Sequence, residues 1–302
     1  MTSICAIYVT YNPDIELLKR SIEITLKQVD FLYIIDNGSK VSLAGLISDF
    51  TLSRTEIVEL NSNKGIAQAQ NIGICKAIDD SYSDFIFFDQ DSLPTKTLVS
   101  DLLSSRVSAC KAGIKVAAVG PVYIDRKSLQ EGVFIRTEGW SLIKQAPRSL
   151  RTSGESFLEC DFLISSGCLF SKEALDVIGS MEEALFIDCV DIEWGFRALS
   201  KGFRCIAAIN AKMYHTVGEA PLRLFGRDFT THSPLRHYYY YRNLYQILKR
   251  SYVPFSWKKY VLMKSTIQAV VFSLFLSPRL KHMKFIGKGI FHGITNKIGR
   301  YE

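Results

Sequence analysis

The sequence is organised around residues 84–92, which read DFIFFDQDS. Four consecutive apolar or aromatic residues form a run too short for a helix, and they predict a strand that is buried on both faces. Asp89 and Asp91 end this run abruptly. Because a carboxylate is rarely buried unless it is paired or binds a metal ion, we expect the two acids at the carboxyl end of the strand, facing a crevice. Open α/β sheets bind their ligands in crevices of this kind.

Two interpretations of these acids are open at this point. In the first, the pair holds a hard divalent cation, which would keep some water ligands and also bind phosphate oxygens of a substrate. In the second, residues 89–92 form an ordinary surface turn whose acids are solvated. Patterns elsewhere in the sequence are needed to distinguish a metal site from a surface turn.

Strand and helix patterns alternate around this stretch, with short connections between them. This alternation predicts an α/β fold with a mostly parallel central sheet. Residues 130–160 contain scattered glycine, proline and basic residues and predict an irregular excursion, a candidate for a mobile loop over the site. The predicted strands are residues 3–10, 31–35, 56–60, 84–89, 116–119, 122–124, 157–164 and 204–209, and the predicted helices include 66–79, 95–110, 171–178 and a weak one near 42–50.

Three of the predicted strands end in polar side chains. Residues 11–12 follow the first strand, residues 36–37 follow the second, and Asp89 with Asp91 follows the central one. Parallel strands present their carboxyl ends at one edge of a sheet, so these groups are expected to line a single crevice. A crevice with three polar strand ends is large enough for a nucleotide.

The composition is that of a folded protein. The chain has 302 residues, of which 47% are hydrophobic and 22% charged, so it can bury one large core or two. Its seven cysteines are odd in number and form no C-x-x-C pair, which indicates reduced thiols in a cytosolic protein. The chain opens directly on a strand pattern, without the basic and apolar regions of a secretory signal. We therefore expect a cytoplasmic location.

The charge is unevenly distributed along the chain. Residues 236–302 contain thirteen Lys and Arg residues and one acid, Glu302, for a net charge of +12, whereas the whole chain carries +7. Such asymmetry suggests a surface that meets nucleic acid or anionic lipid. Residues 261–276 are too short and too interrupted for a membrane-spanning helix and fit an amphipathic helix in a membrane interface. The alternative is a helical subdomain with a solvated basic face.

Several common sites have no support in the sequence. There is no P-loop, no H-E-x-x-H motif and no zinc-ligand spacing. The first strand is not followed by a G-x-G-x-x-G motif, which argues against a dinucleotide-dependent dehydrogenase.

Short motifs in a fixed order carry a resemblance to a known family. The N-terminal motifs resemble family 2 glycosyltransferases of the GT-A fold, and the later ones resemble the rhamnosyltransferase branch of that family. The motifs are YVTYNP at 8–13, DNGS at 36–39, NKG at 63–65, NIG at 71–73, DQD at 89–91, SG at 166–167, IDCVDIEW at 187–194 and YHTVG at 214–218. The resemblance implies a GT-A catalytic domain over residues 1–220. The charge asymmetry and the amphipathic pattern predict a helical, basic C-terminal region over residues 221–302 that associates with a membrane.

The resemblance also implies a binding site for the nucleotide of the donor. The end of the first strand would bind the base through Thr10, Tyr11 and Asn12, and the ring of Tyr11 offers a face for stacking. Asp36 would accept a hydrogen bond from the pyrimidine N3–H, although forming the turn before residues 37–38 is an equally open role.

The remaining donor-binding residues come from the next motifs. Gly65 would let the backbone approach the nucleotide closely, and Asn71 would steady that loop from the helix. Asp89 would lie near the ribose. Asn37 and Gln90, which belong to the same motifs, complete the expected set.

The metal is expected at the other end of the nucleotide. By resemblance, Asp91 would bind Mg²⁺ or Mn²⁺ bridging the diphosphate, and the ion would stabilise the departing group as a Lewis acid. His215 resembles a histidine that reaches the same metal in related enzymes, and Mn²⁺ suits an imidazole ligand better than Mg²⁺ does. Taken alone, His215 fits a structural histidine equally well.

A general base must take the proton of the acceptor hydroxyl group. The family's base lies at the start of a helix, with an arginine six residues further on, and Asp191 with Arg197 has this spacing. Val190 stands where many relatives have a glutamate, which leaves Asp188 and Glu193 as alternative bases.

The resemblance implies an inverting transfer of L-rhamnose from dTDP-β-L-rhamnose to a lipid-linked oligosaccharide in O-antigen (lipopolysaccharide) synthesis. The enzyme would act as a peripheral protein on the inner face of the cytoplasmic membrane and would not bind nucleic acid. Three alternatives stay open. The same fold could use UDP-galactofuranose or a UDP-hexose as donor, the protein could bind a nucleotide sugar without turnover, or its basic C-terminal tail could bind nucleic acid.

Overall fold

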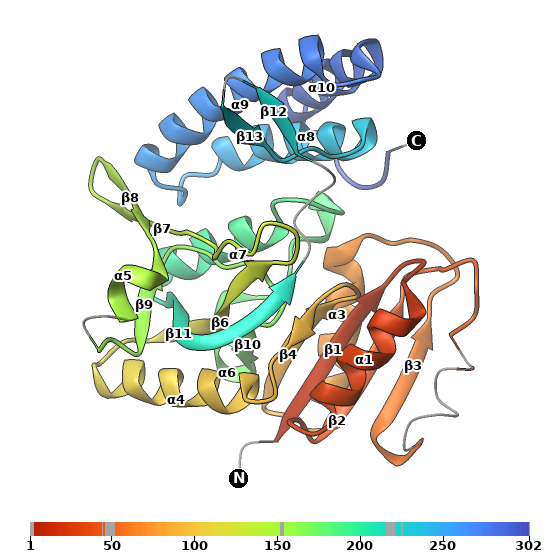
Figure 1. Ribbon diagram of the computed structural model, residues 1–302, viewed down its shortest axis with the longest axis vertical. Coiled ribbons are helices and arrows are strands. Elements are labelled where there is room, and N and C mark those ends of the chain that lie inside the picture. The colour runs from red at the N-terminus through yellow and green to blue at the C-terminus, as the bar shows by residue number, and fades with distance from the viewer. Residues whose placement is uncertain are drawn as a thin grey trace.

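The computed structural model describes residues 3–43, 45, 52–151, 154–215, 221–224 and 226–301. It has a central sheet covered by helices on both faces, with a group of helices beyond one end of the sheet (Figure 1). The helix that the sequence predicts near 42–50 falls largely outside the described residues. In spatial order the strands of the sheet are β3 (Thr55–Glu59), β2 (Phe31–Asp36), β1 (Ile4–Thr10), β4 (Asp84–Asp89), β10 (Leu169–Ser171), β6 (Val116–Asp125), β11 (Arg204–His215) and β5 (Leu93–Pro94), and β9 (Phe157–Cys160) pairs with β11.

The parallel pairing of the long strands sets the position of the site. β1 lies between β2 and β4 and is parallel to both, with Thr10 opposite Asp36 and Val9 opposite Asp89. The short strand β10 runs antiparallel between β4 and β6, and β6 is again parallel to β11. The predicted α/β fold with a mostly parallel sheet is confirmed, and the three polar strand ends meet at one edge of it.

Helices cover both faces of the sheet because its strands are apolar on both sides. Phe85 and Phe87 point to one face and Ile86 and Phe88 to the other, and all four are buried. The predicted central strand is thereby confirmed. The first face is covered by α3 (Ile66–Asp79), α6 (Lys172–Ile178) and α7 (Val190–Ser200), and the second by α1 (Ile15–Thr25) and α4 (Leu98–Lys111).

Residues 130–160 are more regular than the sequence predicts. They form the hairpin β7 (Phe134–Glu138) and β8 (Ser141–Gln145), the short helix α5 (Pro147–Arg151) and strand β9. The prediction of an irregular excursion was wrong for this part. Ile135 and Leu142 of the hairpin pack against the cluster formed with the C-terminal helices, a long-range contact that local sequence patterns do not show.

The C-terminal region is helical, as predicted. Among the helices in the described part of the chain, none combines the length and apolar composition that crossing a bilayer requires. The elements of this region are the strand pair β12 (Leu222–Leu224) and β13 (Arg227–Phe229) and the helices α8 (Pro234–Leu248), α9 (Phe255–Phe275) and α10 (Arg279–Ile294). Earlier in the chain lie the short 3-10 helices η1 (Leu52–Arg54) and η2 (Glu183–Leu185).

Glycines bring α10 against α8. A Cβ atom added at Gly289 would lie 2.5 Å from the backbone oxygen of Tyr238, and one added at Gly293 would lie 2.6 Å from that of Arg242. The absence of side chains at these positions therefore permits a close backbone approach. Gly287 is on the exposed side of the same helix, and a Cβ there would meet nothing within 4 Å.

The two sides of α10 are expected to respond in opposite directions to alanine. Gly287→Ala should raise the free energy of unfolding by about 0.5–1 kcal/mol, because alanine has the higher helix propensity. Gly289→Ala should lower it by about 1–3 kcal/mol, because the Cβ collides with the Tyr238 backbone. Denaturant unfolding of both variants measures the difference. A stable Gly289→Ala protein would contradict the close packing of the two helices.

Candidate active site

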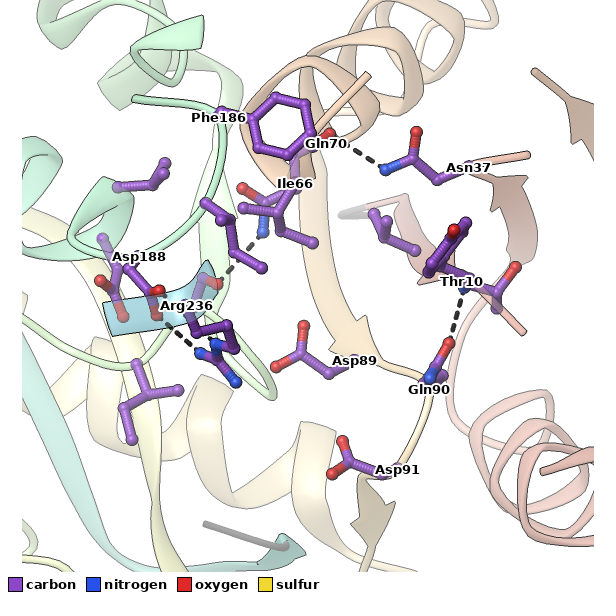
Figure 2. A pocket seen from close by; sticks show the side chains of 18 of the residues that line it. Thr10, Asn37, Ile66, Gln70, Asp89, Gln90, Asp91, Phe186, Asp188 and Arg236 are labelled. Atoms are coloured by element: carbon purple, nitrogen blue, oxygen red, sulfur yellow. Dashed lines mark hydrogen bonds and ion pairs between the residues drawn. The ribbon is translucent and has the colours of Figure 1, made fainter. Parts of the chain in front are cut away.

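A pocket lies at the carboxyl ends of β1 and β4. Its volume is about 530 Å³, within the range of small-molecule sites. Its lining combines the strand ends with the segment before α7 and with the first turn of α8 (Figure 2). Of the residues predicted for the site, those that line the pocket are Thr10, Tyr11, Asn37, Gly65, Asp89, Gln90, Asp91, Asp191 and His215, and those that do not are Asn12, Asp36 and Asn71.

Two acids and a histidine converge at the floor of the pocket. Asp89 ends β4, Asp91 lies in the turn before β5, and His215 is the last residue of β11. One ligand atom from each lies within 4.8 Å of the others, and Asp91 Oδ1 is 3.4 Å from His215 Nδ1. Carboxylate and imidazole atoms at this spacing fit a divalent cation of the Mg²⁺ or Mn²⁺ type, and His215 favours Mn²⁺.

The electrostatics of the floor favour an added cation. Burial raises the pKa of Asp89, and the negative charge of Asp91 raises it further, while His215 and Arg236 act in the opposite direction. Burial is the main cause of the net increase, so the positive charges of His215 and Arg236 do not fully offset the cost of a buried, ionised Asp89. A bound cation would offset the rest of that cost.

Asp36 is held by its own turn. The carboxylate is buried and accepts hydrogen bonds from Thr10 Oγ1 at 3.0 Å, from Ser39 Oγ at 2.5 Å and from the Ser39 backbone N–H at 3.2 Å. The turn-forming interpretation of Asp36 is therefore confirmed. Its contact with a nucleotide base stays a prediction.

Residues 11 and 12 link the loops at the ends of three strands. The Tyr11 N–H donates to Gln90 Oε1 at 2.6 Å, and the Asn12 N–H donates to Ser39 Oγ at 2.7 Å. The side chain of Tyr11 is 44% exposed, which leaves its ring free to stack on a ligand. Asn12 and Gln90 thus fix the loops that shape the pocket.

The backbone conformation and close packing at position 65 require glycine. Its φ of +89° lies in the region that favours glycine, and a Cβ there would be 2.4 Å from the backbone oxygen of Phe186. Asn37 holds this loop by donating from Nδ2 to the Gly65 carbonyl oxygen at 3.2 Å and accepting from the Lys64 N–H at 2.7 Å. The loop after β3 therefore contacts the segment before α7.

Asn71 stabilises a different segment from the one predicted. Its amide group donates to the Met181 carbonyl oxygen at 3.0 Å and to Glu183 Oε1 at 2.9 Å, and accepts from the Met181 N–H at 2.9 Å. These partners precede and begin η2, so Asn71 anchors the start of the segment that leads to Asp191.

The segment before α7 has an unusual backbone. Phe186 and Asp188 have φ values of 64°, and Cys189 has a φ of 65°. Residues other than glycine rarely adopt this conformation, and the surroundings must stabilise it. The next residues begin α7, so this backbone determines where Asp191 lies.

Helix α8 supplies the stabilising contacts. The buried amide of Asn243 directs Nδ2 at three carbonyl oxygens, those of Leu185 at 2.8 Å, Ile187 at 2.7 Å and Asp188 at 2.8 Å. Arg242 Nη2 donates to the Leu185 oxygen as well, at 2.8 Å. These bonds satisfy buried carbonyl groups that the strained backbone leaves without helical partners.

Asp191 faces the pocket from the first turn of α7. Burial raises its pKa to about 6, and the nearby charges of Asp89 and Asp188 contribute to the increase. Its side chain accepts a hydrogen bond from the Ile192 N–H at 2.9 Å, and no cation pairs with it among the described residues. A carboxylate with a raised pKa and a free side facing a pocket can accept a proton.

The two alternative bases are engaged elsewhere. Glu193 is buried, pairs with Arg197 at 2.9 Å and accepts a hydrogen bond from Tyr252 at 2.5 Å. It does not line the pocket. Asp188 does line it but forms an ion pair with Arg236 at 2.6 Å.

Arg236 is a pocket residue that sequence reasoning missed. It lies in the first turn of α8, after the N-cap Ser233. Burial opposes its charge, but the carboxylates of Asp188, Asp89 and Asp91 outweigh this effect and raise its pKa. Figure 2 shows its side chain between Asp188 and Asp89. In the sequence Arg236 is one of thirteen basic residues near the C-terminus, and nothing local distinguishes it from the others.

Several solved structures have a similar fold, including the following two. One is the crystal structure of GalNAc-T7 with UDP, GalNAc and Mn²⁺, with a TM-score of 0.62 and 13% identity over 98% of this chain, which spans 56% of that longer protein. The other is S. aureus TarS 1-349 in complex with UDP-GlcNAc, with a TM-score of 0.60 and 13% identity over 97% of this chain and 82% of that one. These likenesses confirm the predicted GT-A fold.

Sequence comparison identifies the family. Residues 5–179 match the sequence model of glycosyl transferase family 2, and the protein belongs to this family and is a glycosyltransferase. The chain is also similar to dTDP-rhamnosyl transferase RfbF of Shigella flexneri, with 32% identity over 279 residues, which cover 90% of this chain and 86% of that protein.

Replacement of Asn243 should separate positioning from stability. In Asn243→Asp a carboxylate would face three carbonyl oxygens, so the segment before α7 should move and glycosyl transfer should fall at least a hundredfold in kcat. The free energy of unfolding should fall by about 1–3 kcal/mol.

Gln246→Ala is the matched control. Gln246 lies on the same helix, is buried, and donates to the Lys297 carbonyl oxygen at 2.7 Å, away from the pocket. This variant should lose a similar amount of stability and keep its kcat. Equal kcat values for the Asn243 and Gln246 variants would contradict the positioning role.

Proposed function

We propose that the protein transfers L-rhamnose from dTDP-β-L-rhamnose to a hydroxyl group of a lipid-linked oligosaccharide, in the synthesis of a surface polysaccharide such as O-antigen. The donor is supported by the likeness to dTDP-rhamnosyl transferase RfbF over 90% of this chain. The reaction type is supported by one geometric observation: Asp91 and Asp191, a hundred positions apart in sequence, line the same pocket. The protein would act at the inner face of the cytoplasmic membrane.

The donor's diphosphate would lie over the floor of the pocket. Asp91 and His215 would hold the divalent cation, with Asp89 beside them near the ribose. When bound, the ion stabilises the negative charge that develops on the departing nucleoside diphosphate. Arg236, which already faces Asp89, would add a fixed positive charge on the same side.

Asp191 would act as the general base. Its pKa of about 6 keeps most of the carboxylate ionised at neutral pH while leaving it basic enough to accept a proton from the acceptor hydroxyl group. The oxygen that loses this proton attacks the anomeric carbon as the bond to the diphosphate breaks. Direct displacement inverts the configuration, so a β-linked donor gives an α-rhamnoside.

A donor panel tests the proposal. With Mn²⁺ present, the purified protein should release nucleoside diphosphate from dTDP-rhamnose at least tenfold faster than from UDP-galactofuranose or UDP-glucose. EDTA should abolish the release, and added Mn²⁺ or Mg²⁺ should restore it, because the acidic floor needs a cation to accept a diphosphate. Equal or faster turnover of a UDP donor would overturn the assignment of rhamnose, and binding of every donor without turnover would overturn catalysis.

The role of Asp191 predicts a specific pH dependence. At saturating Mn²⁺, kcat should fall about tenfold for each pH unit below about 6, because the base becomes protonated, and should be flat above pH 7. Asp191→Asn should lower kcat by about 10²–10⁴-fold and leave dTDP binding, measured by calorimetry, within about threefold.

As the pH rises and Asp191 ionises, the stability of the protein should fall while its activity rises. A raised pKa means that the fold favours the neutral form of Asp191, so ionisation between pH of about 4 and 6 lowers the free energy of unfolding. The thermal midpoint of Asp191→Asn at pH 7.5 should therefore equal or exceed that of the wild type. Asp176→Asn, at an exposed carboxylate of α6, is the control and should change neither activity nor pH profile. Near-normal transfer by Asp191→Asn would rule out the assigned base.

A further inference from the structure

Helix α9 exposes an apolar stripe. Seven large apolar side chains on it are between 42% and 62% exposed, and six of them, all but Phe275, lie on one side of the helix. The opposite side, with Trp257 and Val261, is buried against α8 and α7. The residues of the stripe are Phe255, Leu262, Met263, Ile267, Val270 and Leu274.

Helix α10 has a second stripe of the same kind. Its buried side carries His282, Ile286, Gly289 and Gly293 and faces α8. The other side exposes Leu280, Met283, Phe291 and Ile294, each by more than half. Figure 1 places α9 and α10 together beyond α8, at the end of the molecule away from the N-terminus. We call these two stripes the outer face.

The segment that carries the outer face is rich in basic residues, and some of them border the two stripes. Residues 237–301 contain twelve Lys and Arg residues and neither Asp nor Glu. Lys259 lies within the α9 stripe, and Lys281 and Lys284 are exposed beside the α10 stripe. An exposed apolar surface of this extent marks an interaction site, and the flanking cations restrict what can cover it.

We propose that the outer face docks on a lipid bilayer with anionic head groups. Apolar side chains would enter the boundary between head groups and acyl chains, and the lysines would contact lipid phosphates, as in amphipathic helices that lie in the plane of a membrane. A groove of about 630 Å³ between Leu248 and the Phe255–Ile267 part of α9 gives an acyl chain room to insert. A second copy of this chain fits less well, because each copy would bring the same uncompensated positive charge.

The outer face is connected rigidly to the active site. Helix α8 carries Arg236 in the pocket at its N-terminus and packs through its backbone against Gly289 and Gly293 of α10. Docking would therefore fix the distance and orientation of the pocket relative to the bilayer. This consequence rests on the proposed lipid-linked acceptor, whereas the docking itself does not.

Vesicle flotation tests the docking. Wild-type protein should float with phosphatidylcholine vesicles that contain about 30% phosphatidylglycerol, and it should bind vesicles of phosphatidylcholine alone at least tenfold more weakly. Met263→Glu/Ile267→Glu should lose at least tenfold in partitioning to the anionic vesicles. Lys281→Gln/Lys284→Gln should lose about fivefold for each charge and should respond less to salt.

Val107→Glu/Val177→Glu is the matched control. These valines are 52% and 50% exposed on α4 and α6, so the variant has the same change in charge away from the outer face. Because its net charge is two units lower, this variant should bind the anionic vesicles slightly more weakly than the wild type, but it should retain most of the wild-type partitioning. Circular dichroism and dTDP binding, which should match the wild type in all variants, establish that each is folded.

The outcomes distinguish docking from the proposed function. Unchanged flotation of Met263→Glu/Ile267→Glu, or absence of wild-type flotation, would overturn the docking whatever the donor panel shows. A wild-type dimer in sedimentation velocity that this variant abolishes, together with no vesicle binding, would assign the outer face to a second copy instead. Turnover of dTDP-rhamnose without vesicles tests the catalytic proposal alone.

Discussion

The amide of Asn243 is the contact on which the active site depends most. The carbonyl oxygens of Leu185, Ile187 and Asp188 point at it, and the backbone of this segment has φ values that residues with side chains rarely adopt. Without a donor in that position, the oxygens of Ile187 and Asp188 would lose this hydrogen bond, whereas the oxygen of Leu185 would keep the one from Arg242. The segment would then relax toward an ordinary turn. Asp191 follows directly, so one side chain on α8 determines where the opposing carboxylate of the pocket lies. The parallel sheet forms one wall, and α8 holds the other in place.

Charge imposes the second constraint on the pocket. Asp89, Asp91, Asp188 and Asp191 all line it, and burial together with mutual repulsion raises the pKa values of Asp89 and Asp191. Arg236 pairs with Asp188 and offsets part of this charge. The negative charge that Arg236 does not offset attracts a divalent cation at the floor of the pocket and keeps Asp191, on the opposite side, weakly acidic. A bound cation would lower the pKa of Asp89 at the floor and leave Asp191 as the proton acceptor. The repulsion that lowers stability would thus give Asp89 and Asp191 different functions.

Sequence reasoning succeeded where a local pattern corresponds to a local cause. The run at 85–88 could only be a buried strand, and parallel pairing then placed the groups after β1, β2 and β4 at one edge. It failed where the cause is a long-range contact. The hairpin at 134–145 is stabilised by packing on the C-terminal helices, and Arg236 enters the pocket because of how α8 is placed. Gly65 and Asn71 were recognised as special, but their partners, Phe186 and Met181, lie more than a hundred residues away and have no signature in the sequence.

The helix that completes the pocket also connects it to the outer face. Residue 220 divides the chain by composition, because the basic residues are concentrated after it, yet α8 contributes Arg236 to the lining and Asn243 to the segment before α7. A catalytic unit that ended at 220 would lack both groups. The close approach of α10 at Gly289 and Gly293 then leaves little freedom between α8 and the surface beyond it. If the proposed acceptor is anchored in a bilayer, its sugar would have to be presented at a fixed height, and a short, closely packed connection between the outer face and Asp191 would provide this without a flexible linker.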